Sequence, residues 1–541
     1  MNKTGLQAIA KELLSRRGIT VAIVLLSILG RIIQLVFFYN IRVDASYQVL
    51  ATEHFVNGHG ISFAEVPASN LAITNYQPLV NWPPGYSLLL APFYLLAGKN
   101  YILAGIVLDI LAAILLILVS RMLLKRLDVP LHLRNIFTLL SSFFIYSFYL
   151  IASSDAIAIA FFITAIYFFV LLADKDRNRF RNILCFTIGL LICAWIKYLF
   201  IPVVFILPAL LFIKGKQERN PYLKKNGIIS FSILLLGVAA LLIYQKMSTG
   251  TAAYISQPER GFFLKHLLDF YPFIPAAFMR PDSWEMTGLQ PAHVMMAYRM
   301  IHLLVLLVLI TWLTKLAIKS EFKIKDGKKA FLYGNALISL GIIFLLAYLS
   351  LMVAKEEIWP GVFWTYFEET RYYGLVYFFI HLSIFIYHGF WRSNKFPKLV
   401  FVFMMLMLSA EALRGMVLTS KRIVLFGRET YSWQDETRFQ VYADSVIKKA
   451  KQSSGVNRVV VSGSSYYMNH RVSLYSHVPI LYDLGKLNHM DSLHSTEPTL
   501  LTVILHKDQL SKFPGFLSSA GKEVAGQYNG FYFYTVYVQP Q

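Results

Sequence analysis

Long apolar segments dominate the hydropathy pattern of this chain. Runs of roughly membrane-spanning length lie at 19–39, 100–120, 135–151, 156–173, 182–197, 199–213, 227–246, 294–314, 330–353, 372–390 and 399–418. A helix needs about 20 apolar residues to cross a bilayer, because it rises by about 1.5 Å per residue. The pattern therefore predicts a polytopic α-helical membrane protein with eleven transmembrane helices.

Basic residues gather in alternate connecting segments. The set that begins with residues 1–18 holds 26 Lys and Arg, whereas the other set holds seven. Because cytoplasmic loops carry the excess of Lys and Arg, the N-terminus is expected in the cytoplasm and the C-terminus outside a plasma (bacterial inner) membrane. No small-residue cleavage site follows the first run, so we interpret it as an uncleaved signal anchor.

The composition agrees with this picture. Of the 541 residues, 56% are hydrophobic and 15% are charged, and the mean hydropathy is +0.54. The net charge of +21 is accounted for by cytoplasmic loops, so we expect no nucleic-acid partner. Cys185 and Cys193 share one apolar run and lie about 12 Å apart along a helix, which is too far for a disulfide.

The outer face is expected to carry a long first loop at 40–99, a very short loop at Ser153–Asp155, two further loops, and everything after residue 418. The first loop contains the apolar stretch 87–96, which is too short to span a membrane and is typical of an interfacial helix. We divide the chain into a transmembrane catalytic module at 1–420 and an extracytoplasmic domain at 421–541.

The extracytoplasmic domain is predicted to be a small α/β fold of about 110 residues. Ser432 begins a helical stretch with a capping-box-like spacing to Asp435. Strand-like runs follow at 457–463, 478–485, 499–507 and 530–538. The segment contains no glycine-rich phosphate loop, no paired cysteines and no Gly-x-Ser-x-Gly nucleophile motif.

Four charged residues are expected at the outer ends of the helices. Asp44 follows the first helix, Asp155 lies in the very short loop, Lys197 separates two apolar runs, and Arg371 begins a late helix. Two acids and two bases at one face of a bundle can activate a hydroxyl and hold an anionic leaving group. Transporters place such groups near the bilayer midplane instead, and here the charges are expected at one surface.

Each of these residues also has a structural interpretation. Asp44 and Asp155 are good helix caps, and Lys197 can extend to the interface. Arg371 can pair with Glu368 or Glu369 in the same loop.

The loop residues have similar alternatives. His54 and His59 are candidate site residues, but they also suit an interface, and Trp82 fits an aromatic belt equally well. Asp44 and Asp155 do not have a diagnostic metal-ligand spacing, so we expect metal-independent chemistry without a cofactor, although acidic residues alone could hold a divalent ion.

Several segments resemble motifs of the GT-C superfamily of polytopic glycosyltransferases. They are Asp44-Ala-Ser-Tyr47 with the stretch to Asn57-Gly58-His59-Gly60, Trp82-Pro83-Pro84-Gly85-Tyr86 running to Pro92, Ser154-Asp155, and Arg371-Tyr372-Tyr373. The resemblance covers roughly the first 390 residues. It is strongest to the branch that holds the protein O-mannosyltransferases, the aminoarabinose transferase of lipid A and related bacterial sugar transferases.

The resemblance implies an inverting transfer of a hexose or pentose from a polyprenyl-phosphate donor to a hydroxyl of a glycan, lipid or protein. Asp44 would be the general base, with Asp155 beside the acceptor or the sugar. Arg371 and then Lys197 would bind the donor phosphate. Further site candidates are Tyr47, His54, His59, Trp82, Tyr86, Glu369 and Tyr372.

The sequence departs from both named activities. Ala45 follows Asp44 where the mannosyltransferases have a second acid, and Ser46 and Tyr47 stand where the aminoarabinose transferase has a basic residue. The motifs therefore point to the superfamily and leave the sugar and the acceptor open. A transporter or lipid flippase without transfer chemistry is the alternative function, and a scaffold that binds a partner through its C-terminal domain is a third.

Overall fold

The computed structural model describes most of the chain. The described residues are 16–37, 43–143, 154–174, 179–250, 261–269, 271–281, 284, 288–318, 323–324, 326–352, 356–359, 362–364, 370–389, 395–425, 432–463, 466–519 and 522–540. For Asp44 this description covers the backbone.

The chain forms two compact units, each taken here by itself. The helical unit comprises residues 1–37, 109–150 and 154–424, and the mixed unit comprises 38–108, 151–153 and 425–541. The mixed unit therefore joins the first loop to the C-terminal domain, although more than 300 residues separate the two in sequence.

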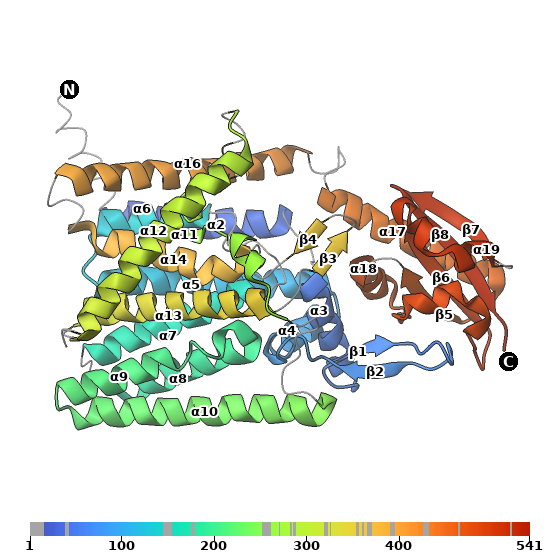
Figure 1. The fold of residues 1–541 in the computed structure, drawn as a ribbon, viewed down its shortest axis with the longest axis horizontal. Helices are drawn as coiled ribbons and strands as arrows, with labels where there is room; N and C mark the ends of the chain where they lie inside the picture. Colours follow the sequence, from blue (N-terminus) through green and yellow to red (C-terminus); the bar gives the residue numbers. More distant parts are fainter. Residues whose placement is uncertain are drawn as a thin grey trace. The chain divides into compact units, whose positions relative to one another are not determined.

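The helical unit contains most of the apolar runs (Figure 1). Its main helices are α2 (Arg17–Phe37), α5 (Tyr101–Arg126), α6 (Leu131–Ser142), α7 (Ser154–Ala173), α8 (Arg179–Ile196), α9 (Ile206–Gln217), α10 (Pro221–Thr249), α12 (Pro291–Ile318), α13 (Gly327–Met352), α14 (Gly374–Ile386) and α16 (Lys395–Leu425). Short elements complete it: η1 (Tyr198–Phe200), η2 (Leu264–Asp269), α11 (Phe273–Ala276), β3 (Glu356–Trp359), β4 (Val362–Trp364) and η4 (Thr370–Tyr373).

Every one of the eleven predicted apolar runs contains a helix. Among the described residues, seven helices are long and apolar enough to cross a membrane: α2, α5, α7, α10, α12, α13 and α16. The helices α6, α8, α9 and α14 are shorter. The prediction of a polytopic α-helical membrane protein is confirmed.

Close packing brings neighbouring helices together. α7 and α8 run antiparallel, because Cys193 near the end of α8 donates a hydrogen bond to the carbonyl of Ala158 near the start of α7. α9 and α10 approach even more closely at Gly227, where a Cβ atom would lie 2.7 Å from the backbone nitrogen of Phe212. Only glycine permits that approach.

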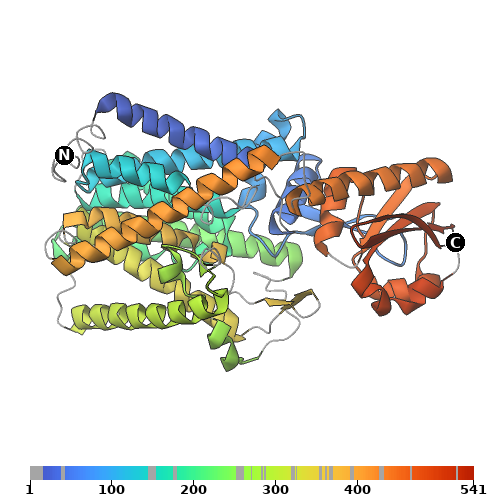
Figure 2. The ribbon, with the colours of Figure 1, turned by 90° about the horizontal axis from the view of Figure 1, so that it is seen from above.

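The mixed unit is built around a four-stranded sheet in the order β5-β6-β8-β7. β5 (Arg458–Gly463) pairs parallel with β6 (Thr499–His506), and β8 (Phe531–Val538) pairs antiparallel with both β6 and β7 (Lys522–Tyr528). Figure 2 shows α17 (Ser432–Ser454) along one face of this sheet. Phe439 and Val446 of α17 form an apolar core there with Val461, Ile504 and Phe533.

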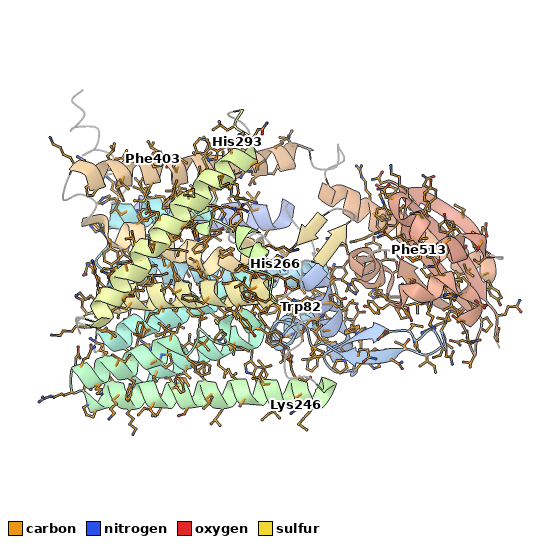
Figure 3. All side chains as sticks on the ribbon, viewed as in Figure 1. Trp82, Lys246, His266, His293, Phe403 and Phe513 are labelled. Atoms are coloured by element: carbon orange, nitrogen blue, oxygen red, sulfur yellow. The ribbon has the colours of Figure 1, made fainter. Side chains whose placement is uncertain are left out.

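The first loop contributes to the apolar cluster on the other face of the sheet. Val66 and Leu71 are buried in one apolar cluster with Leu481, Leu501 and Val503 of the C-terminal segment. Phe513, labelled in Figure 3, belongs to the same cluster.

Backbone hydrogen bonds fix this part of the loop. Val66 donates to the carbonyl of Ile480, and Leu71 donates to the carbonyl of His494, each at 2.8 Å. The guanidinium of Arg458 donates to the carbonyl of Leu71 at 3.1 Å. The first loop therefore contributes to the core of the C-terminal domain.

The remaining elements of the mixed unit are local. In the first loop they are α3 (Val43–Val56), the hairpin of β1 (Ser62–Glu65) and β2 (Asn75–Pro78), and α4 (Gly85–Leu96). In the C-terminal segment they are α18 (Tyr466–Ser476), η5 (Leu484–Asn488), η6 (Met490–Ser492), η7 (Lys507–Lys512) and α19 (Pro514–Ser518).

The predicted α/β domain is confirmed, with two corrections. The helix at 432 and the strands at 457–463, 499–507 and 530–538 are α17, β5, β6 and β8. Residues 478–485 do not form a regular strand; Ile480 makes single bridges to Glu65 and Val461. The strand β7 was not predicted, since half-exposed β7 has no apolar alternation of the kind that marks a strand.

Replacing Leu71 with Ala should destabilise the mixed unit. Leu71 is fully buried, so the loss of its side chain leaves a cavity, and we expect the free energy of unfolding to fall by about 2–5 kcal/mol. Ile73→Ala is the matched control, because Ile73 is 48% exposed two residues away. Thermal unfolding of the purified protein in detergent measures both, and an equal effect of the two changes would contradict the assigned packing.

Candidate active site

Asp155 and Lys197 lie at the same end of two packed helices. Asp155 is in the first turn of α7, and Lys197 follows the last residue of the antiparallel α8. Lys197 has an extended backbone, with φ −150° and ψ 125°, so it interrupts the helical path before η1.

The two side chains form an ion pair. The Lys197 ammonium contacts a carboxylate oxygen of Asp155, and the two side chains are only 10% and 11% exposed. At this degree of burial neither charge has enough water around it to be stable alone, so each depends on the other.

Tyr372 brings a second cation to the pair. The Lys197 ammonium lies 4.6 Å from the centre of the Tyr372 ring, and the Arg371 guanidinium lies 5.1 Å from it. Arg371 also donates from Nη2 to the Tyr372 hydroxyl at 3.4 Å. The negative face of an aromatic ring attracts cations, so one tyrosine contacts both basic groups.

Packing fixes the segment that carries Arg371 and Tyr372. Both residues are in η4, whose last residue, Tyr373, is completely buried. The Tyr373 ring stacks on Phe273 with 4.8 Å between centroids. The packing of Tyr373 therefore fixes Arg371 and Tyr372 at the start of α14.

The structure thus brings together four of the predicted site residues: Asp155, Lys197, Arg371 and Tyr372. Two basic side chains and one carboxylate meet around the Tyr372 ring. Arg and Lys side chains in a poorly hydrated position bind phosphate and carboxylate groups through charge-assisted hydrogen bonds. The cluster is therefore suited to hold a small anion.

Other predicted residues lie in the mixed unit. Asp44 is the second residue of α3, and its side chain, like Glu369, is outside the described part of the chain. Tyr47 stacks on Trp82, which Figure 3 labels, with 5.0 Å between centroids. Tyr86 in α4 is completely buried.

The two loop histidines contact one tyrosine. His59 stacks on Tyr76 with 3.8 Å between ring centroids. His54 donates from Nδ1 to the carbonyl of Ser62 at 2.8 Å, and burial lowers its pKa below the ordinary value of a histidine. His54 thus joins α3 to β1, which favours its structural interpretation.

The sequence analysis missed two charged residues inside apolar helices. Arg31 of α2 and Asp109 of α5 are 4% and 3% exposed and line one cavity of about 30 Å³. The Arg31 guanidinium donates to Oε1 of Gln34 at 2.6 Å. The expectation that the charges occupy one surface is wrong at these positions. A charged residue within each apolar run was the sequence signal that could have identified them.

No group of three or more His, Cys, Asp and Glu side chains suited to a metal ion occurs in the described ranges. Metal-independent chemistry remains a prediction.

Solved structures with the same architecture exist. The crystal structure of ArnT from Cupriavidus metallidurans in the apo state matches with a TM-score of 0.53 and 13% identity, over 96% of this chain and 98% of that chain. The structure of the same protein bound to undecaprenyl phosphate matches with a TM-score of 0.51 and 12% identity, over the same shares of both chains. No protein-family model and no curated protein sequence matches the chain.

At such low identity this likeness is a likeness of fold. It extends over nearly the whole of both chains, from the helical runs to the C-terminal sheet. The chain shares the fold of ArnT over nearly the whole length of both chains.

The ion pair predicts a specific pattern of stability. Asp155→Asn and Lys197→Met each leave a buried charge without its partner, so each should lower the free energy of unfolding by about 3–5 kcal/mol. The double variant removes both charges and should recover most of that loss. Melting temperatures of the three detergent-purified variants test this, and additive losses in the double variant would show that the two residues do not depend on each other.

Proposed function

We propose that this protein is a membrane glycosyltransferase that moves a sugar from a polyprenyl-phosphate donor to a hydroxyl acceptor. The cluster of Asp155, Lys197, Arg371 and Tyr372 is the observation that carries this proposal. The fold shared with ArnT supports it, as does the undecaprenyl phosphate bound to that protein.

The basic side chains of the cluster suit the phosphate of the donor. A polyprenyl-phosphate sugar is a phosphodiester with one negative charge, which Arg371 and Lys197 can bind through charge-assisted hydrogen bonds. When the sugar leaves, the phosphate gains negative charge. Arg371 and Lys197 then interact more strongly with the transition state than with the bound donor, and such a difference accelerates the reaction.

Asp44 would act as the general base. The acceptor oxygen attacks the anomeric carbon, and its proton moves to the Asp44 carboxylate. The bond between the anomeric carbon and the phosphate oxygen breaks, and its electron pair stays on the polyprenyl phosphate. A single displacement of this kind inverts the anomeric centre. We propose a hexose or a pentose as the transferred sugar.

Asp155 would hold Lys197 in place. Its ion pair with Lys197 supports this role in addition to the expected one beside the acceptor or the sugar. An ammonium fixed by a carboxylate loses little further freedom when the phosphate binds, which favours binding.

The orientation follows from the basic segments. We propose a multi-pass protein of the plasma (bacterial inner) membrane with a cytoplasmic N-terminus, an extracytoplasmic C-terminus, and transfer at the outer face. The acceptor would be a glycan, a lipid or a protein.

Among the described residues, the cavity beside Arg31 and Asp109 gives little support to the transporter alternative. A transporter needs a passage for its substrate near the membrane centre. The cavity beside Arg31 and Asp109 measures about 30 Å³, which is room for one or two water molecules. These two opposite charges more simply compensate each other inside the helices.

Asp44→Asn should abolish sugar transfer without loss of the protein from the membrane. The amide cannot accept the acceptor's proton, so we expect transfer to fall by a factor of about 10² to 10⁴. Membranes from cells that make each form are supplied with radiolabelled polyprenyl-phosphate sugars, and label is followed into glycans, lipids and proteins. Asp128→Asn is the control, since the Asp128 side chain is 83% exposed. Equal transfer by wild type and Asp44→Asn would remove Asp44 from the mechanism.

Arg371→Gln should weaken binding of the donor and slow the departure of polyprenyl phosphate from the sugar. Loss of one cation removes about 1.5–3 kcal/mol of charge-assisted interaction, so kcat/KM for the donor should fall by roughly tenfold to a hundredfold. Titration of the labelled donor in the same membranes gives this value, with acceptor KM as an internal reference. An unchanged kcat/KM for the donor would rule out Arg371 as a phosphate ligand.

A further inference from the structure

We infer that the C-terminal α/β domain positions the helix that begins with Asp44, and that His470 is its main positioning residue. The inference rests on the proposed function, because it concerns the placement of the proposed base. It assigns a role in the reaction to a domain that lies at the far end of the sequence from Asp44.

The contact is between α18 and the second turn of α3. The His470 ring lies 3.8 Å from the Tyr47 ring, measured between centroids, and His470 is completely buried. Tyr47 follows position 44 by three residues, which is about one turn of helix. Trp82 stacks on Tyr47 as well, so two rings from other segments hold this tyrosine.

Four rings form a closed circuit around this contact. The Nε2 atom of His470 and the hydroxyl of Tyr482 share a hydrogen bond of 2.7 Å. Tyr482 contacts Phe63 edge-on at 5.7 Å, and Phe63 contacts Tyr47 at 5.8 Å. Because the circuit includes α3, β1, α18 and the segment after α18, a movement of α3 must disturb all four.

A second link holds the other half of α3. Glu53 accepts a hydrogen bond from His477, just beyond α18, at 3.0 Å between Oε1 and Nδ1. Tyr47 and Glu53 are about 9 Å apart along the helix, because they are six residues apart. Two separate contacts with the C-terminal domain restrict both the tilt and the rotation of the helix.

The contact made by His470 does not depend on charge. Burial lowers the pKa of His470 to about 3, so the ring is neutral at any physiological pH. Its positioning effect therefore comes from the shape of the ring and the hydrogen bond to Tyr482. A phenylalanine at this position preserves the contact of the ring and loses the hydrogen bond to Tyr482.

Placement of this kind affects the chemical step more than binding. A displacement of about 1 Å in a catalytic group can cost a factor of about 10² in rate. The donor lipid does not depend on α3 for the charge of its binding site, which is supplied by Lys197 and Arg371. A shifted α3 should thus lower kcat and leave the KM of the donor nearly unchanged.

The test compares three changes in the full-length protein in membranes. His470→Ala should lower kcat by roughly tenfold to a hundredfold with little change in the donor KM. His470→Phe should keep most of kcat, because it restores the ring contact. Val472→Ala is the matched control: Val472 is on the same helix and equally buried, but it packs in the apolar core on the α17 side.

The outcomes separate this inference from the proposed function. A kcat of His470→Ala equal to that of Val472→Ala, beside an inactive Asp44→Asn, overturns the positioning role alone. A donor KM that rises while kcat stays constant overturns it as well. If wild type transfers no sugar, the proposed function fails and the inference fails with it. If His470→Ala does not accumulate, His470→Leu preserves the apolar volume without the ring and gives the same comparison.

Discussion

The burial of a short piece of the first loop in the core of the C-terminal sheet is the interaction on which the mixed unit depends. Val66 and Leu71 have almost no exposed surface, and their backbone amides donate to carbonyls of the C-terminal segment. Apolar burial and satisfied backbone groups occur at the same residues, so separation of the two segments would expose both. The loop that begins near Asp44 and the domain that ends the chain are therefore one folding unit.

A different constraint governs the charges of the helical unit. Asp155 and Lys197 are removed from water at the ends of α7 and α8, and a charge in that environment is stable only beside its opposite. The Tyr372 ring extends this environment to Arg371. The positions of these charged groups are fixed by helix packing rather than by flexible surface side chains, and preorganised charge of this kind favours catalysis.

The sequence predicted a large part of this structure. Apolar runs of about 20 residues are a strong signal, because the membrane imposes their length, and each of the eleven runs contains a helix. The strands β5, β6 and β8 were found because they are apolar and bounded by polar segments, whereas the polar edge strand β7 was not. Asp155, Lys197 and Arg371 were singled out by their places at the ends of apolar runs, and the GT-C motifs added Tyr372.

The sequence by itself determined what depends on local order along the chain: the membrane class, the helices and most strands of the α/β domain. Only the tertiary structure decided which distant residues meet. The packing of α7 against α8 joins Asp155 to Lys197, and the sheet joins residues 66–71 to residues 458–503. It also showed that Arg31 and Asp109 line one cavity and that His470 contacts Tyr47. Hydropathy and spacing indicate the environment of each segment. Contacts between segments arise instead from side-chain shape and from the need to pair buried polar groups.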